Sequence, residues 1–120
     1  MLVSIQGLIL CKEPYFNEAG YESLRTSPEA RDNARLYHEA ALLRTVASMT
    51  AIACRPPETF ASIVAQHCKA TRDRLLGWLN SLLYRSEQLK IDFALLPLSD
   101  GFKVALAHHI PDLRAALERF

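Results

Sequence analysis

The 120-residue sequence has little of what marks specialised protein classes. Its three cysteines, Cys11, Cys54 and Cys68, are an odd number without CxxC spacing, which favours buried reduced thiols over disulfides or a zinc site. Lysine and arginine number 14 against 13 aspartates and glutamates, and no run of like charges predicts contact with nucleic acid. The apolar stretch at residues 1–11 is shorter than the roughly 20 residues that span a bilayer. We therefore expect no nucleic-acid partner, no membrane partner, and a cytoplasmic or nuclear location.

What is present is an ordinary globular composition arranged in helical patterns. Half of the residues are hydrophobic and 22% are charged, which fits one domain with a modest core. Apolar residues at helical spacing predict a helix over residues 1–11. Pro14 cannot continue that helix, so residues 14–26 are expected to form an ordered, irregular loop.

A long helix is expected to follow this loop. Ser27 is placed to cap it, Pro28 suits its first turn, and Arg55-Pro56-Pro57 should end it after Cys54. Its apolar face is predicted to carry Leu36, Ala40, Leu43, Val46 and Ala47.

Most of the rest of the chain is also predicted to be helical. One helix is expected from Pro57 to about Cys68, and a second from a cap at Thr71 to about Ser86. The first should bury Phe60, Ile63 and Val64, and the second should have a wide apolar face of Leu75, Leu76, Trp78, Leu79, Leu82 and Leu83. Residues 91–101 are predicted to be extended, followed from Phe102 by a helix pair that bends at Pro111. The fold class is therefore all-α for this chain.

Catalytic constellations and cofactor motifs are scarce. His67-Cys68 and His108-His109 are sequence neighbours, which diverge by about 100 degrees on a helix and so make neither a thiolate–imidazolium pair nor a metal motif. His38 and Glu39 are expected on a solvated helix face. We predict no metal and no cofactor.

Two stretches at the N-terminal end carry a family resemblance. "LVSIQGLIL" followed by "EPYFNEAGYE" resembles the segment after the catalytic region of ubiquitin-conjugating enzymes, specifically the large, ligase-independent class O carriers. The giant inhibitor-of-apoptosis carriers share the "EPYFNE" loop. The resemblance continues through "YHEAALLRTVASMT", "RPPETF" and "QHC" and resumes at "LLPLSDGF" and "LRAAL".

This resemblance implies a fold and a set of roles. Residues 1–86 would be the C-terminal helical part of an α+β ubiquitin-conjugating (UBC-like) domain, and residues 87–120 an extended linker with a C-terminal helical extension. The four-stranded sheet and the catalytic cysteine of the family would lie upstream, so the chain would begin inside a helix of that domain and be inactive alone.

The resemblance also implies partners and site residues. Ubiquitin would be the partner, with ubiquitin-activating enzyme and protein substrates joining in the complete enzyme. Val3, Ser4 and Gly7 would contact donor ubiquitin, and Asn17 and Glu18 would form the environment of the acceptor lysine. The commoner family loop reads "DPNPDDP", so the acidic role could fall on either of these two residues.

Two other interpretations stay open at this point. The chain could be a cysteine-less module that binds ubiquitin or another partner. It could also be a plain helical scaffold, in which the small-residue stripe of Ser4, Gly7 and Cys11 merely packs under a neighbouring element.

Overall fold

A computed structural model describes residues 14–84 and 97–120, most of which are helical. Three α-helices are described, α2 (Pro28–Cys54), α3 (Ala61–Tyr84) and α4 (Asp100–Leu117). Two short 3-10 turns, η1 (Pro14–Asn17) and η2 (Glu22–Leu24), precede α2, and a third, η3 (Glu58–Phe60), lies between α2 and α3. Within the described ranges no residue forms a strand. The all-α prediction is therefore confirmed, whereas the helix predicted over 1–11 lies outside the described residues.

The described residues fall into two compact units. The loop unit holds residues 14–41 and Pro97, and the helical unit holds residues 42–84 and 98–120. The first half of α2 belongs to the loop unit and the second half to the helical unit. The predicted boundary at residue 86 stays a prediction, because it falls in the undescribed range 85–96.

The long helix begins and ends where the sequence predicts. Ser27 directly precedes α2, and its Oγ accepts a hydrogen bond from the Ala30 amide at 3.1 Å, which satisfies one of the amides that a helix start leaves without a partner. The helix ends at Cys54, ahead of the two prolines of the "RPP" corner.

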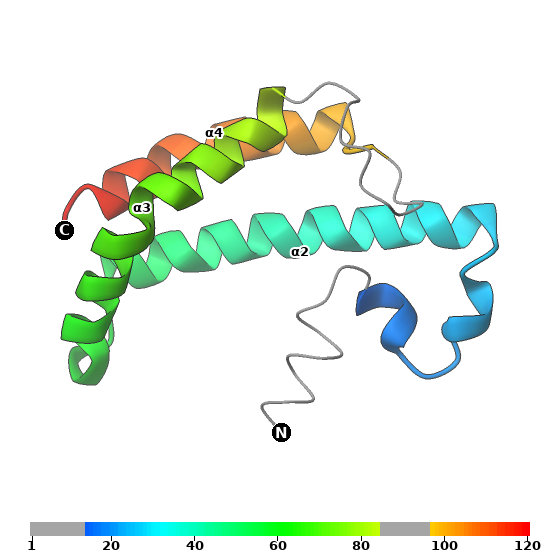
Figure 1. The fold of residues 1–120 in the computed structure, drawn as a ribbon, viewed down its shortest axis with the longest axis horizontal. Helices are drawn as coiled ribbons and strands as arrows, with labels where there is room; N and C mark the ends of the chain where they lie inside the picture. The colour runs from blue at the N-terminus through cyan, green and yellow to red at the C-terminus, as the bar shows by residue number, and fades with distance from the viewer. Residues whose placement is uncertain (1–13, 85–96) are drawn as a thin grey trace. The chain divides into compact units, whose positions relative to one another are not determined.

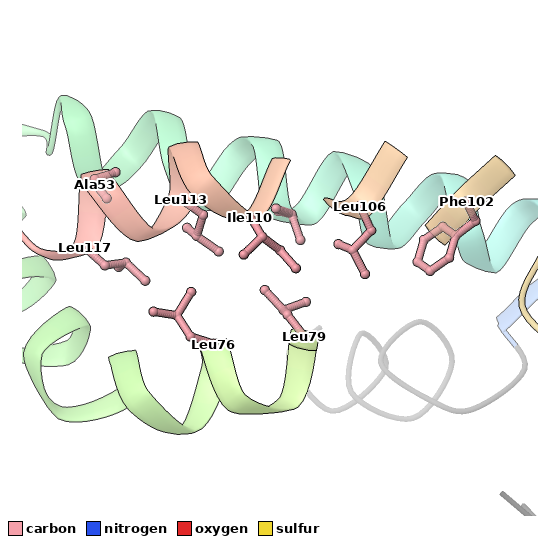
Figure 2. Close-up of a cluster of buried hydrophobic side chains, with 10 residues drawn as sticks. Ala53, Leu76, Leu79, Phe102, Leu106, Ile110, Leu113 and Leu117 are labelled. Atoms are coloured by element: carbon pink, nitrogen blue, oxygen red, sulfur yellow. The ribbon is translucent and has the colours of Figure 1, made fainter. Parts of the chain in front are cut away.

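The core of the helical unit lies between α3 and α4, which run side by side (Figure 1). Leu76 and Leu79 of α3 face Leu106 and Leu113 of α4, and all four are at most 6% exposed (Figure 2). Removing each such side chain from water stabilises the fold by about 1.5–3 kcal/mol. The buried members of this core are Val46, Ala53, Leu76, Leu79, Phe102, Leu106, Ile110, Leu113, Ala116 and Leu117.

Two predicted helix breaks are absent from the helical unit. Helix α3 continues through Thr71, whose Oγ1 donates to the His67 carbonyl oxygen at 2.8 Å, so this hydroxyl is satisfied inside the helix and caps nothing. Helix α4 continues through Pro111 and begins earlier than predicted, at Asp100. Ser99 caps α4, because its Oγ accepts from the Phe102 amide at 3.2 Å.

Burial also departs from the prediction at the start and on the outer side of α3. Phe60 and Ile63 are 55% and 62% exposed, and Trp78 is 49% exposed. The side of α3 that faces α4 is supplied by Leu76 and Leu79, which leaves Trp78 off that side. In the described ranges no helix is long and apolar enough to cross a membrane.

Candidate functional site

The candidate site is the last residue of η1 and the turn that follows it in the loop unit. Phe16 of η1 is 2% exposed and packs against Ala30 and Ala34 of α2. These two alanines are four residues apart and so lie on one face of the helix, where their small side chains leave room for the phenyl ring. The ring therefore fixes the start of the turn on a rigid element.

An aromatic cluster covers this anchor. The Tyr15 ring lies 5.3 Å from the Phe16 ring, 5.1 Å from the Tyr21 ring and 6.0 Å from the Tyr37 ring, measured between centroids. The Arg25 guanidinium stands 5.5 Å from the centre of the Phe16 ring, within the range of a cation–π contact. The two ends of the turn are thus held by side chains from η1, from the chain around η2, and from α2.

Two hydrogen bonds donated by backbone amides close the turn itself. The Tyr21 amide donates to the Glu18 carbonyl oxygen at 3.0 Å, and the Gly20 amide donates to Glu22 Oε2 at 3.1 Å. Gly20 has φ +90°, a backbone conformation that costs glycine little and strains other residues. This closure leaves Asn17 half-buried and Glu18 exposed.

The arrangement presents one carboxylate and one amide on a fixed turn. The exposed Glu18 carboxylate can accept hydrogen bonds from, and balance the charge of, an amine that approaches from solvent. Val3, Ser4 and Gly7, the predicted donor-ubiquitin contacts, lie outside the described residues. The structure therefore describes Asn17 and Glu18 of the predicted site, and the roles of all five residues stay predictions.

Sequence reasoning missed the residues that support this turn. Tyr37 and the pair Ala30 and Ala34 belong to α2, which the sequence treats as a separate element from the loop. The four-residue spacing of the two alanines was the available signal that α2 has a small-residue face able to receive a ring. The solvated face predicted at His38 and Glu39 is wrong for Glu39, which is only 6% exposed.

The remaining chemically active groups are dispersed. Cys54 and Cys68 are free thiols, and the prediction of a buried thiol is wrong for Cys54, which is exposed, whereas Cys68 is half-buried. Burial raises the pKa of the Cys68 thiol above its usual value. Within residues 14–84 and 97–120 no three histidine, cysteine or carboxylate side chains gather as a metal site would need.

Comparison with known proteins gives a consistent set of relatives. The chain is 32% identical to the Arabidopsis thaliana protein "Probable ubiquitin-conjugating enzyme E2 23" over 98% of its own length, and 40% identical to "Probable ubiquitin-conjugating enzyme E2 24" of the same plant over 97%. It is 30% identical over 98% of its length to the human "Dual E2 ubiquitin-conjugating enzyme/E3 ubiquitin-protein ligase BIRC6". These relatives are ubiquitin-conjugating enzymes.

The chain matches a small part of each of these ubiquitin-conjugating enzymes. It spans 11% and 13% of the two plant proteins and 2% of the human one. No family model matches the chain. The similarity to ubiquitin-conjugating enzymes covers the loop unit and the helical unit alike, since each of these alignments takes in nearly the whole chain.

Proposed function

We propose that this chain serves the transfer of ubiquitin from an enzyme cysteine to lysines of protein substrates, as part of a large, class O ubiquitin-conjugating enzyme. The names of the relatives, which align with 97–98% of the chain, carry this proposal. Ubiquitin-activating enzyme would load the cysteine in the complete protein. The free thiols of Cys54 and Cys68 are compatible with a reducing compartment, so we place the protein in the cytoplasm or nucleus.

The proposed reaction needs a nucleophile that we assign to a cysteine outside this chain. A neutral lysine amine attacks the thioester carbonyl, the thiolate leaves, an amide bond forms, and the amine loses a proton. Burial raises the pKa of Cys68, which disfavours the thiolate that must accept ubiquitin. Neither Cys54 nor Cys68, each in a later helix, corresponds to the nucleophile position that the family resemblance implies.

The role we assign to this chain is geometric. The turn of Asn17 and Glu18 would face the acceptor lysine, where the exposed Glu18 carboxylate would orient the amine by hydrogen bonding and accept the proton that the amine loses once it has attacked. Val3, Ser4 and Gly7 would hold donor ubiquitin in one orientation. The burial of Phe16 against Ala30 and Ala34 of α2 supports the role proposed for the turn, because a positioning group is effective only when its own backbone is fixed.

The test replaces the aligned segment of the Arabidopsis protein E2 24 with this chain and measures two steps without any ligase. Charging is followed as a thiol-sensitive ubiquitin adduct, and discharge as the loss of that adduct to free lysine. We expect the Gly7→Arg chimera to charge normally and to discharge about 100-fold more slowly, since a lost productive orientation costs about that much. Glu18→Ala should slow discharge to a smaller extent, because it removes a group that orients the amine and accepts its proton and leaves the orientation of ubiquitin intact.

A matched control separates this proposal from loss of folding. Glu29→Ala removes a carboxylate from the exposed first turn of α2 and should leave both steps unchanged. Equal loss of charging and discharge in the folded Gly7→Arg chimera would contradict the assignment to donor ubiquitin. Equal discharge by Glu18→Ala and Glu29→Ala would contradict the assignment of Glu18.

A further inference from the structure

The helical unit has an open groove between α2 and α3. Its volume is about 370 Å³, and one wall comes from α2 and the other from α3. The residues that line it are Met49, His67, Thr71, Arg74, Leu75 and Trp78. Neither Asn17 nor Glu18 is among them, so the groove is separate from the candidate transfer site.

The groove is part of a longer exposed stripe on α3. Ile63, His67, Arg74 and Trp78 recur at intervals of four, seven and four residues, which places them on one face of the helix. Ile63 is 62% exposed and Trp78 is 49% exposed. From Ile63 to Trp78 the stripe runs about 22 Å, the length of about four helical turns. Exposed apolar side chains gathered along one face are typical of a protein interaction site.

Arg74 is the one formally charged side chain among the residues that line the groove. Residues 42–84, which supply both walls, contain five lysines and arginines (Arg44, Arg55, Lys69, Arg72, Arg74) and two carboxylates, Glu58 and Asp73. Asp73 already pairs with Arg72 at 3.2 Å. Arg74 lines the groove and forms no ion pair among the described residues. The groove therefore offers an uncompensated positive charge beside an apolar floor.

We propose that this groove binds an amphipathic α-helix of a partner protein whose apolar row is flanked by glutamate or aspartate. The apolar row would fill the groove over Met49, Leu75 and Trp78, as in other complexes where a helix lies in a groove. The flanking carboxylates would pair with Arg74, which selects an acidic helix over a basic one. The inference concerns binding in the helical unit and is independent of ubiquitin transfer.

Trp78 supplies the measurement, because it is the single tryptophan of the chain and lines the groove. The 120-residue chain is titrated with a synthetic helical peptide of about 18 residues, with leucine at i, i+3, i+4 and i+7 spacing, glutamate beside the leucines and alanine elsewhere. A second peptide has lysine in place of each glutamate. We expect the glutamate peptide to shift the Trp78 emission to shorter wavelength and to bind at least about tenfold more tightly than the lysine peptide.

Charge reversal inside and outside the groove gives a matched pair of variants. Arg74→Glu should weaken binding of the glutamate peptide about tenfold, because a like charge then faces the carboxylates. Lys69→Glu makes the same change of charge on α3, at an exposed residue outside the groove lining, and should change the affinity less than about twofold. Helical content measured by circular dichroism checks that both variants are folded.

Several results would overturn this proposal. Equal binding of the two peptides, no shift with either, or equal weakening by Arg74→Glu and Lys69→Glu would each do so. A Trp78 shift that follows protein concentration alone, with a dimer in sedimentation, would assign the groove to a second copy of the chain. A shift with anionic phospholipid vesicles and none with the glutamate peptide would assign it to a lipid surface.

Discussion

Phe16 is the residue that most directly fixes the candidate site. Its ring packs against Ala30 and Ala34 at the start of α2, and Tyr15 and Arg25 cover it. The sequence predicts an ordered, irregular loop here, and the structure confirms an ordered turn. The local pattern of residues 14–26 does not specify which helix face receives Phe16, and the spacing of Ala30 and Ala34 on α2 was the one signal for this contact.

Cysteine reactivity gives a prediction at the residue scale. Iodoacetamide reacts with the thiolate, and burial raises the pKa of Cys68, so at pH 8 Cys68 should be alkylated several-fold more slowly than the exposed Cys54. The difference between the two alkylation rates should become smaller as pH rises through the raised pKa of Cys68. Peptide sequencing by mass spectrometry after timed quenching measures each site, and alkylation of Cys68 as fast as Cys54 would contradict the burial.

The same shift links Cys68 to stability. Because the folded state holds the pKa of this thiol above its unfolded value of about 8.5, the neutral thiol favours folding at pH values below that value. The contribution is lost as pH rises through the folded pKa. The free energy of unfolding should therefore fall between neutral pH and about pH 10. This fall should be smaller in Cys68→Ser than in Cys54→Ser, because only Cys68→Ser removes the thiol with the raised pKa.

At the scale of elements, the start and end of α2 were predictable and the continuity of α3 and α4 was not. Ser27, Pro28 and the "RPP" corner are local signals that act through the backbone of α2 itself. Thr71 carries an equally local cap signal, yet α3 continues through it because Leu76 and Leu79 pack against α4 as part of one helix. Tertiary packing overrides the local preference at Thr71.

Pro111 is the clearest case of such an override. It has no amide hydrogen to donate, it is exposed, and α4 continues through it because Ile110 and Leu113 on either side are both buried in the core. We expect Pro111→Ala to raise the free energy of unfolding by about 1–3 kcal/mol, since proline costs about 3 kcal/mol in a helix interior and alanine returns some entropy to the unfolded chain. Urea denaturation followed by circular dichroism measures this.

Pro28→Ala is the control for that measurement. Pro28 lies in the first turn of α2, where its fixed φ suits the helix and no donor is needed, so alanine there should give no gain in stability. A loss of stability in Pro111→Ala, or an equal gain in both variants, would show that Pro111 is not a strained position in α4.

At the scale of the whole molecule, the function we propose gives this chain the positioning of the acceptor lysine and of ubiquitin, and it assigns the nucleophile to a cysteine of the complete enzyme. The relatives are ubiquitin-conjugating enzymes, and the chain spans about a tenth of the two plant proteins. The turn of Asn17 and Glu18 is built as a fixed surface feature, and the thiols of the described residues lie in α2 and α3. The sequence resemblance located the turn, whereas its rigid support by α2 came from the structure.

The most direct measurement of this account compares the 120-residue chain with the chimera in which it replaces the aligned segment of the Arabidopsis protein E2 24. Both are incubated with ubiquitin-activating enzyme, ATP and ubiquitin, and then with free lysine. The account predicts no thiol-sensitive adduct on the chain alone, and on the chimera an adduct that discharges to lysine at a rate within about tenfold of the parent. An adduct on the chain alone that disappears with Cys54→Ala or Cys68→Ala, or a chimera that charges and does not discharge, would contradict it.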